Sequence, residues 1–221
     1  MGWHPAAARG QGGTRGWVGR TAIATDVRAL MDNIASRYDF RDKSVIHVGA
    51  GGGRLIGYAT GARSVLAVDA DAEAVRRLGV TLRERGLVSR FIVFKGELAS
   101  VRARADVVFF EFCLHAAADP AAALRHARAL APETLLVDHA PGSRWSWTCG
   151  EEAGVERLWD AAGRFPAARD ETVVGAEQFH DYDELAAAVG GRGEPALGRI
   201  AEFRGRQGIA IPMPYRIALL R

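Results

Sequence analysis

Short apolar runs alternate with amphipathic stretches over the first two thirds of the chain. Runs rich in β-branched and aromatic residues predict strands at 44–48, 64–69, 90–95, 106–112 and 134–138. Apolar residues at near-helical spacing predict helices at 18–38, 53–60, 72–86 and 120–130. Such alternation favours a parallel sheet with helices on both faces. The third and fourth strands are so close in sequence that we expect the helix between them to be short or missing.

Local signals mark several helix ends. Asp119 and Pro120 are typical of an N-cap and a first-turn proline, and Asp71 is interpreted as the N-cap of the helix at 72–86. Gly86 is expected to end that helix.

The pattern changes after residue 140. Three of the five tryptophans, Trp145, Trp147 and Trp159, gather around a predicted helix at 151–164. They are expected either to form ordinary core or to wall an acceptor pocket, and we interpret residues 141–180 as a substrate-side insertion. A helix at 182–189 follows, and the apolar runs 199–203 and 215–220 predict an antiparallel pair of strands.

Composition narrows the class of protein. A chain of 221 residues that is 48 % hydrophobic predicts one domain, here 17–221 after a flexible leader at 1–16. The net charge of +3 equals the charge of Arg9, Arg15 and Arg20, so the remainder is balanced, which argues against a broad nucleic-acid face. No stretch resembles a signal peptide or a membrane span, and the two cysteines are expected to be free thiols. A cytoplasmic protein is predicted.

A glycine-rich turn follows the first predicted strand. Gly49, Gly51 and Gly53 come directly after an apolar run, and Asp69 closes the next run. Glycines allow a sharp turn and close approach of a ligand, and a later carboxylate can accept bonds from ribose hydroxyls. A dinucleotide site needs a glycine where this chain has Arg54, so a nicotinamide oxidoreductase is disfavoured.

This Gly-x-Gly-x-Gly pattern with its following aspartate resembles motif I of class I S-adenosylmethionine-dependent methyltransferases, and the resemblance spans about residues 40 to 221. It implies an α/β fold, a doubly wound, mostly parallel seven-stranded sheet with an antiparallel last strand and a Rossmann-like crevice at the strand ends. It also implies S-adenosylmethionine as the cofactor. The implied cofactor-binding residues are Gly49, Ala50, Gly51, Gly53, Asp69, Ala70, Glu97, Leu98 and Glu111.

The resemblance implies that Asp69 would accept hydrogen bonds from the ribose hydroxyls and that Glu97 would accept one from the adenine amino group. The glycine turn is expected to open a helix whose N-terminus faces the site. The family usually carries an acidic residue where this chain has His47. Either His47 bonds only locally, or the cofactor's ammonium is held differently, with Glu111 as a possible substitute.

Transfer to an alcohol or amine also requires removal of a proton, for which histidine is the usual side chain. His139 directly follows the fifth strand beside Asp138 and is the first candidate, with Asp138 placed to orient its ring or to share the proton. The alternative is that Asp138 and His139 only satisfy loop amides before Pro141. His115 after the fourth strand is the second. His126 is expected to face solvent and His180 to be structural. No local pair of histidines has metal-ligand spacing, so no metal is predicted.

These residues favour methyl transfer to an oxygen or nitrogen of a small-molecule metabolite, with the helix at 17–38 as a lid. The alternatives are an S-adenosylmethionine-binding protein with regulatory or non-methylating chemistry, or an RNA-modifying enzyme that uses the arginine-rich leader as a nucleic-acid arm. The acceptor and the oligomeric state are not determined by the sequence.

Overall fold

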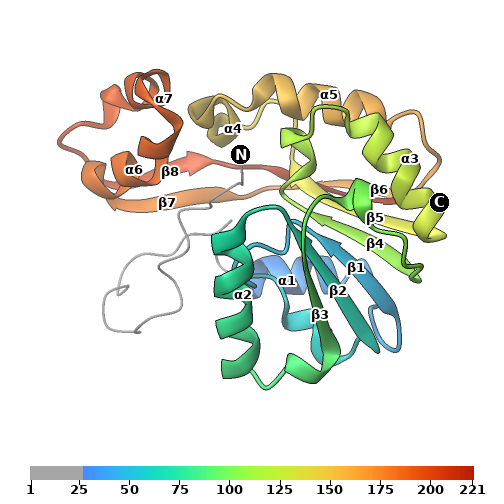
Figure 1. The fold of residues 1–221 in the computed structure, drawn as a ribbon. Coiled ribbons are helices and arrows are strands. Elements are labelled where there is room, and N and C mark those ends of the chain that lie inside the picture. Colours follow the sequence, from blue (N-terminus) through green and yellow to red (C-terminus); the bar gives the residue numbers. More distant parts are fainter. Residues whose placement is uncertain (1–26) are drawn as a thin grey trace.

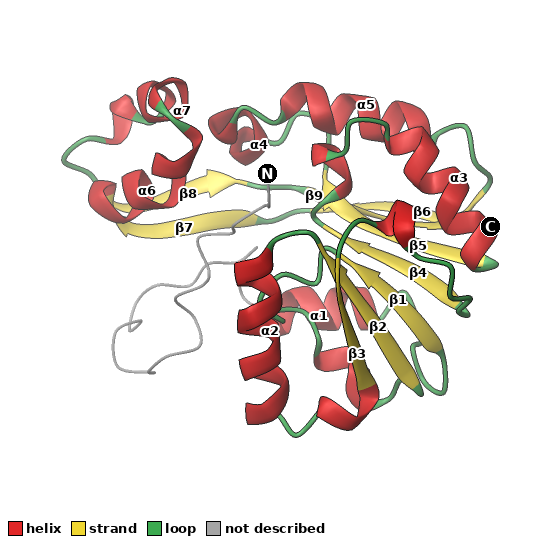
Figure 2. Cartoon of the chain, viewed as in Figure 1, coloured by secondary structure: helices red, strands yellow, loops and turns green. Residues whose placement is uncertain are grey.

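The computed structural model describes residues 27–221, which form one large sheet flanked by helices and one two-stranded arm (Figures 1 and 2). The strands of the large sheet are β1 (Ser44–Val48), β2 (Ser64–Asp69), β3 (Phe91–Lys95), β4 (Val107–Glu111), β5 (Glu133–His139), β6 (Ala167–Val173) and β9 (Tyr215–Leu220). Their order is β3-β2-β1-β4-β5-β9-β6. Only β9 runs antiparallel to its neighbours β5 and β6. The predicted fold class, including the reversed last strand, is confirmed.

Helices cover both faces of this sheet. On one face α1 (Val27–Ala35) and α2 (Ala72–Glu84) pack on residues such as Val65 and Phe109. On the other, α3 (Pro120–Leu130) and α5 (Glu152–Ala162) pack on residues such as Phe110 and Leu136. Buried strands with apolar side chains on both faces are what a doubly covered parallel sheet requires.

The predicted helix ends are correct where a side chain acts as a cap. Asp71 accepts from the amide of Glu73, and Asp119 accepts from that of Ala122. Between β3 and β4 there is only a short 3-10 helix, Leu98–Ser100, as expected. The helix predicted at 18–38 is α1 over its described part and ends at Ala35; residues 1–26, with the leader, lie outside the described part of the chain.

Two predicted elements are wrong. After the glycine turn there is no α-helix at 53–60, only a 3-10 helix at Gly57–Thr60. Gly49, Gly51 and Gly53 all have positive φ, which a right-handed helix does not allow. No helix N-terminus therefore faces the site from this turn, and the amides of its three glycines donate within the protein, to the carbonyl of Val68, to Asp69 and to the carbonyl of Ala50.

The second wrong element is the strand at 199–203. Those residues end α7 (Glu194–Arg199) and form a 3-10 helix at Ala201–Phe203. Strand β9 instead pairs with β5 and with β6, and the sequence of β6 is mostly polar because it is a largely exposed edge strand. An apolar pattern does not reveal such a strand.

An arm extends from the β6 and β9 end of the sheet (Figure 1). Strands β7 (Ala176–Asp181) and β8 (Gln207–Pro212) form a two-stranded antiparallel sheet, and α6 (Tyr182–Val189) and α7 lie between them in sequence. Trp145 on α4 (Arg144–Cys149) stacks on Phe179 of β7, with ring centroids 5.6 Å apart. The predicted insertion at 141–180 thus contains α4, α5, β6 and most of β7; its substrate-side role stays a prediction. Over the described residues, none of the helices has the length and apolarity needed to cross a membrane.

Candidate functional site

A cavity of about 920 Å³ opens at the carboxyl ends of β1, β2, β3 and β4. The predicted cofactor residues that line it are Gly49, Asp69, Ala70, Glu97, Leu98 and Glu111. Ala50, Gly51 and Gly53 do not line it and act through the turn instead. This is where the ligand crevice of a doubly wound sheet is expected.

The glycine turn and Asp69 form one hydrogen-bonded unit. The amide of Gly51 donates to Asp69 Oδ2 at 2.9 Å, and the amide of Asp71 donates to Oδ1 at 2.9 Å. Each carboxylate oxygen still has a second lone pair for another donor. Gly49 is required here, because a Cβ on it would lie 2.6 Å from the Cβ of Cys113.

Beneath the turn, His47 and Glu111 form a buried pair. His47 Nε2 lies 2.9 Å from Glu111 Oε2, and its Nδ1 lies 3.0 Å from the hydroxyl of Tyr58. The structure therefore brings Glu111 next to the unusual His47, on a strand end that also lines the cavity.

Arg54, which follows the glycine turn, is also affected by its surroundings. Burial lowers the pKa of Arg54, while the charges of Glu177 and Glu111 partly offset that effect.

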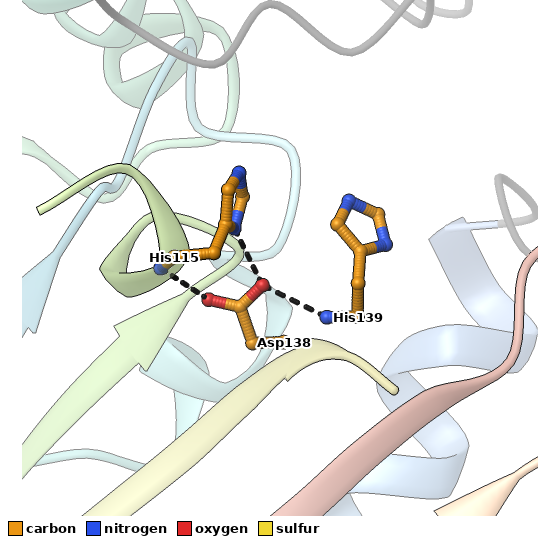
Figure 3. Close-up of side chains that lie close together, drawn as sticks. All are labelled: His115, Asp138 and His139. Carbon is orange, nitrogen blue, oxygen red and sulfur yellow. Dashed lines mark hydrogen bonds and ion pairs between the residues drawn. The ribbon is translucent and has the colours of Figure 1, made fainter. Parts of the chain in front are cut away.

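A second polar cluster lies beyond β4 and β5. It comprises His115, Asp138, His139 and Glu151, which come from the 3-10 helix Leu114–Ala116, the end of β5 and the residue before α5. Asp138 Oδ1 accepts from His115 Nδ1 at 2.6 Å and from the amide of His139 at 2.8 Å (Figure 3). Asp138 thus orients the ring of His115, not that of His139 as predicted.

Glu151 faces both imidazoles from the other side. Its Oε1 lies 3.6 Å from His115 Nε2, and its Oε2 lies 3.8 Å from His139 Nε2. Arg192 forms an ion pair with the same carboxylate. Phe112, Cys113 and Leu114, just before His115, line the cavity, so the cluster borders the space where the glycine turn and Asp69 lie.

Comparison with known proteins assigns the family. A model of the methyltransferase domain matches residues 21–193. The chain belongs to the methyltransferase domain family. It is an S-adenosylmethionine-dependent methyltransferase, and the cofactor predicted from the glycine turn is confirmed. No curated protein matches its sequence.

Solved structures share the fold at low sequence identity. The YcgJ protein from Bacillus subtilis is similar with a TM-score of 0.64 at 14 % identity, covering 86 % of this chain and 96 % of that one. Magnesium protoporphyrin IX methyltransferase from Synechocystis PCC 6803, solved with bound S-adenosylmethionine, has a TM-score of 0.54 at 16 % identity, covering 88 % and 77 %. The cyclase SpnF has a TM-score of 0.57 at 18 % identity, covering 91 % and 86 %.

The two histidines in the cluster of this methyltransferase, His115 and His139, have pKa values shifted in opposite directions. Burial works to lower the pKa of His115, but the hydrogen bond to Asp138 and the negative charges of Asp138 and Glu151 outweigh it and raise the pKa to about 10. Burial and the charge of His115 lower the pKa of His139 to about 4. Burial raises the pKa of Glu151, yet His115 and Arg192 bring it down to about 2. At neutral pH the site therefore holds one charged imidazole, one neutral imidazole and a carboxylate.

Sequence reasoning did not assign several residues of the methyltransferase site. Glu151 and Arg192 carry no local motif, and only the fold brings them to the histidines. Gly154 lies on α5 where a Cβ would be 2.3 Å from the carbonyl oxygen of His115, so α5 packs directly on that segment. Phe112 has φ of 41° while fully buried, a strained conformation at the end of β4 that no sequence pattern indicates.

The remaining predicted residues fall outside the cluster. His126 lines the cavity and contacts the carbonyl of Val101 at 3.1 Å, so the expectation that it faces solvent is wrong. His180 is half-exposed and pairs with Asp181 before α6, a contact at a helix N-terminus. Trp147 is covered by the guanidinium groups of Arg144 and Arg199, and the indole of Trp159 donates to the carbonyl of His139.

Proposed function

We propose that this methyltransferase transfers the methyl group of S-adenosylmethionine to an oxygen or nitrogen of a small-molecule acceptor. The observation that carries the proposal is the buried cluster of His115, Asp138, His139 and Glu151 beside the cofactor cavity. The sulfonium is already activated, so the protein has to align acceptor, methyl carbon and sulfur and has to manage the acceptor's proton.

The cavity accounts for the cofactor half of this proposal. Asp69 would accept from the ribose hydroxyls with the lone pairs that the Gly51 and Asp71 amides leave. Glu97 and Leu98 would border the adenine, and Gly49 and Glu111 the methionyl part. The methyl group would then point toward Phe112 and the cluster behind it.

The cluster accounts for the acceptor half. Its imidazoles are almost fully buried, so the reacting group must enter an enclosed space, which suits a small molecule better than a duplex surface. Attack by the acceptor's oxygen or nitrogen breaks the bond between the methyl carbon and sulfur, whose electron pair stays on sulfur. The acceptor's proton passes to the cluster, where His139 is neutral at neutral pH.

The test uses labelled cofactor and a metabolite extract. S-adenosylmethionine with an isotopic methyl group is incubated with the protein, and S-adenosylhomocysteine release and label in small molecules are measured after size filtration. We expect the parent protein to release S-adenosylhomocysteine and to label small molecules. In His139→Ala the labelling should fall ~10²-fold, as it does when other proton acceptors are removed. His180→Ala, at the exposed pair with Asp181, is the matched control and should behave as the parent.

Three results would overturn the proposal. Label in RNA rather than in small molecules would favour a nucleic-acid acceptor. Cofactor binding without S-adenosylhomocysteine release would favour the regulatory or non-methylating alternative. Unchanged S-adenosylhomocysteine binding in Asp69→Ala, measured by calorimetry, would remove the assigned cofactor site.

A further inference from the structure

The imidazoles of His115 and His139 both lie beside the carboxylate of Glu151, and one ligand atom each of His115, Asp138 and His139 lies within 4.8 Å of the others. His115 Nε2 and His139 Nε2 lie 3.6 Å and 3.8 Å from the two oxygens of Glu151. These separations are longer than hydrogen bonds. They are close to the ~3.4 Å that separates neighbouring ligands of an ion bound tetrahedrally at about 2.1 Å.

Asp138 prepares His115 for this role. Its two oxygens accept four bonds, from the amides of Leu114, His115 and His139 and from His115 Nδ1. Four acceptor sites are all that a carboxylate has, so Asp138 has no lone pair left for an ion. It fixes His115 Nδ1 as the donor, and the ring's other nitrogen, Nε2, faces Glu151. A carboxylate behind a histidine is the usual support of a metal-binding imidazole.

Figure 3 shows the imidazoles of His115 and His139 on the same side of Asp138, although they come from different segments of the chain. Their ring centroids are 5.3 Å apart, and both side chains are buried. His115 Nε2 and Glu151 Oε2 are buried atoms that have no hydrogen-bond partner among residues 27–221. The site therefore gathers two imidazoles and a carboxylate within a few ångströms of one another.

We propose that His115 Nε2, His139 Nε2 and the Glu151 carboxylate bind one divalent transition-metal ion. Two imidazole nitrogens and one carboxylate suit Zn²⁺, Fe²⁺, Co²⁺ or Mn²⁺, whereas Ca²⁺ and Mg²⁺ prefer oxygen ligands alone. Three protein ligands leave at least one coordination position open. Arg192 holds Glu151 in place through its ion pair, and Gly154 lets α5 bring Glu151 against the His115 segment.

The proposal replaces the expectation that no metal binds. That expectation relied on the absence of a local ligand pair in the sequence. The ligands come from three segments that only the folded sheet and α5 bring together, so local spacing could not reveal them.

The function of the ion rests on the proposed methyl transfer. The open position would take the acceptor's oxygen, and the positive charge would lower the pKa of its hydroxyl, as metal ions do for bound water. With the ion bound, His139 is a ligand and does not take the proton, which would leave to solvent instead; the oxygen would attack the methyl carbon, and the electron pair of the broken carbon–sulfur bond would stay on sulfur. The preferred acceptor would then be a hydroxylated or chelating small molecule.

Metal binding is tested without any acceptor. The purified protein is treated with a chelator, desalted and titrated with Co²⁺, whose visible absorption reports the number and kind of ligands, and with Zn²⁺ by calorimetry. We expect one ion per chain. Binding should be lost in His139→Asn and in Glu151→Gln and should be weakened 10–100-fold in Asp138→Asn, which keeps the ligands but alters the support of His115. His180→Asn is the control and should bind as the parent does.

A measurement on the parent protein keeps the proposal falsifiable if a variant does not fold. X-ray absorption of the Zn²⁺-loaded protein should show two imidazole ligands at about 2.0–2.1 Å. Absence of stoichiometric binding, or binding that survives both ligand substitutions, would overturn the proposal. Methyl transfer that persists in the presence of a chelator would refute the ion's function and leave the proposed methyl transfer standing. An ion bound without any turnover would refute the proposed methyl transfer and leave only the metal site standing.

Discussion

The two halves of the crevice differ in how far apart in sequence their polar groups lie. On the cofactor side, Gly51 and Asp69 are hydrogen-bonded across 18 residues, within one strand–turn–strand unit. On the acceptor side, the contacts of Glu151 reach back to His115 and forward to Arg192. The first half is a local motif that two adjacent parallel strands create by themselves. The second exists only after α5 and the arm have packed, which is why the motif names the cofactor and leaves the acceptor open.

The largest effect is expected on the cofactor side, from His47→Phe. Phenylalanine keeps the stacking on Phe109 but leaves the carboxylate of Glu111 buried without its partner. Breaking such a pair costs about 3 kcal/mol or more, so the unfolding free energy should fall by that amount in urea titrations. His180→Phe, at an exposed position, should change it by less than about 0.5 kcal/mol. Equal effects of the two substitutions would mean that the pair does not support the turn.

Gly154→Ala should separate the two halves. The new Cβ would meet the carbonyl of His115, and overpacking of this kind costs about 1–3 kcal/mol. We expect the melting temperature and methyl transfer to fall, while calorimetry shows S-adenosylhomocysteine affinity close to the parent's. The control is Gly190→Ala, where a Cβ has open space. Loss of cofactor affinity in Gly154→Ala would show that the halves are not independent.

The pH dependence of stability, measured with a chelator present, should be set by the acceptor side. His115 has its pKa raised from 6.5 to about 10, so its contribution is complete below pH 6.5 and is lost as the pH rises toward 10. His139 has its pKa lowered from 6.5 to about 4, so its contribution is complete above pH 6.5 and is lost as the pH falls toward 4.

Stability should therefore be greatest near pH 6.5 and should fall by about 1.4 kcal/mol for each pH unit on either side, a slope that one proton sets. Glu151 adds a further loss below pH 4.5, because its pKa is lowered from 4.5 to about 2. Urea titrations at several pH values give the curve. In His115→Asn the alkaline limb should flatten; an unchanged alkaline limb would refute the assignment to His115.

The smallest effect is expected from Trp147→Leu. The indole is partly exposed and lies between the guanidinium groups of Arg144 and Arg199, at 3.8 Å and 4.9 Å from its ring centre. Contacts of this kind contribute about 0.5–1 kcal/mol. Thermal unfolding should show a small decrease, whereas Trp145→Leu, which removes the buried stack on Phe179, should show a larger one. A larger decrease in Trp147→Leu than in Trp145→Leu would mean that Trp147, and not Trp145, stabilises the packing of the arm.

The sequence predicts an element correctly where the signal is local and incorrectly where a backbone conformation or a tertiary contact determines the structure. The caps Asp71 and Asp119 are correct because a side chain bonds its own helix. The helix at 53–60 is wrong because the turn's glycines adopt positive φ, and the strand at 199–203 is wrong because β9 pairs with the polar edge strand β6. His139 was expected to be oriented by Asp138, but the carboxylate faces the ring of His115, which only the neighbouring strand β4 brings near.

The sequence by itself determined the sheet's parallel core, because strand periodicity acts over a few residues. The glycine turn and the strand-end carboxylate are equally local, and the family resemblance that they carry implied the reversed last strand and the cofactor. The tertiary structure decided which buried groups meet: Glu111 with His47, Asp138 with His115, and Glu151 with both acceptor-side imidazoles. Burial then sets their charges, since the pKa of each group depends on desolvation and on neighbours that lie far from it in sequence. Tertiary packing thus determines the charges of the groups that face the acceptor.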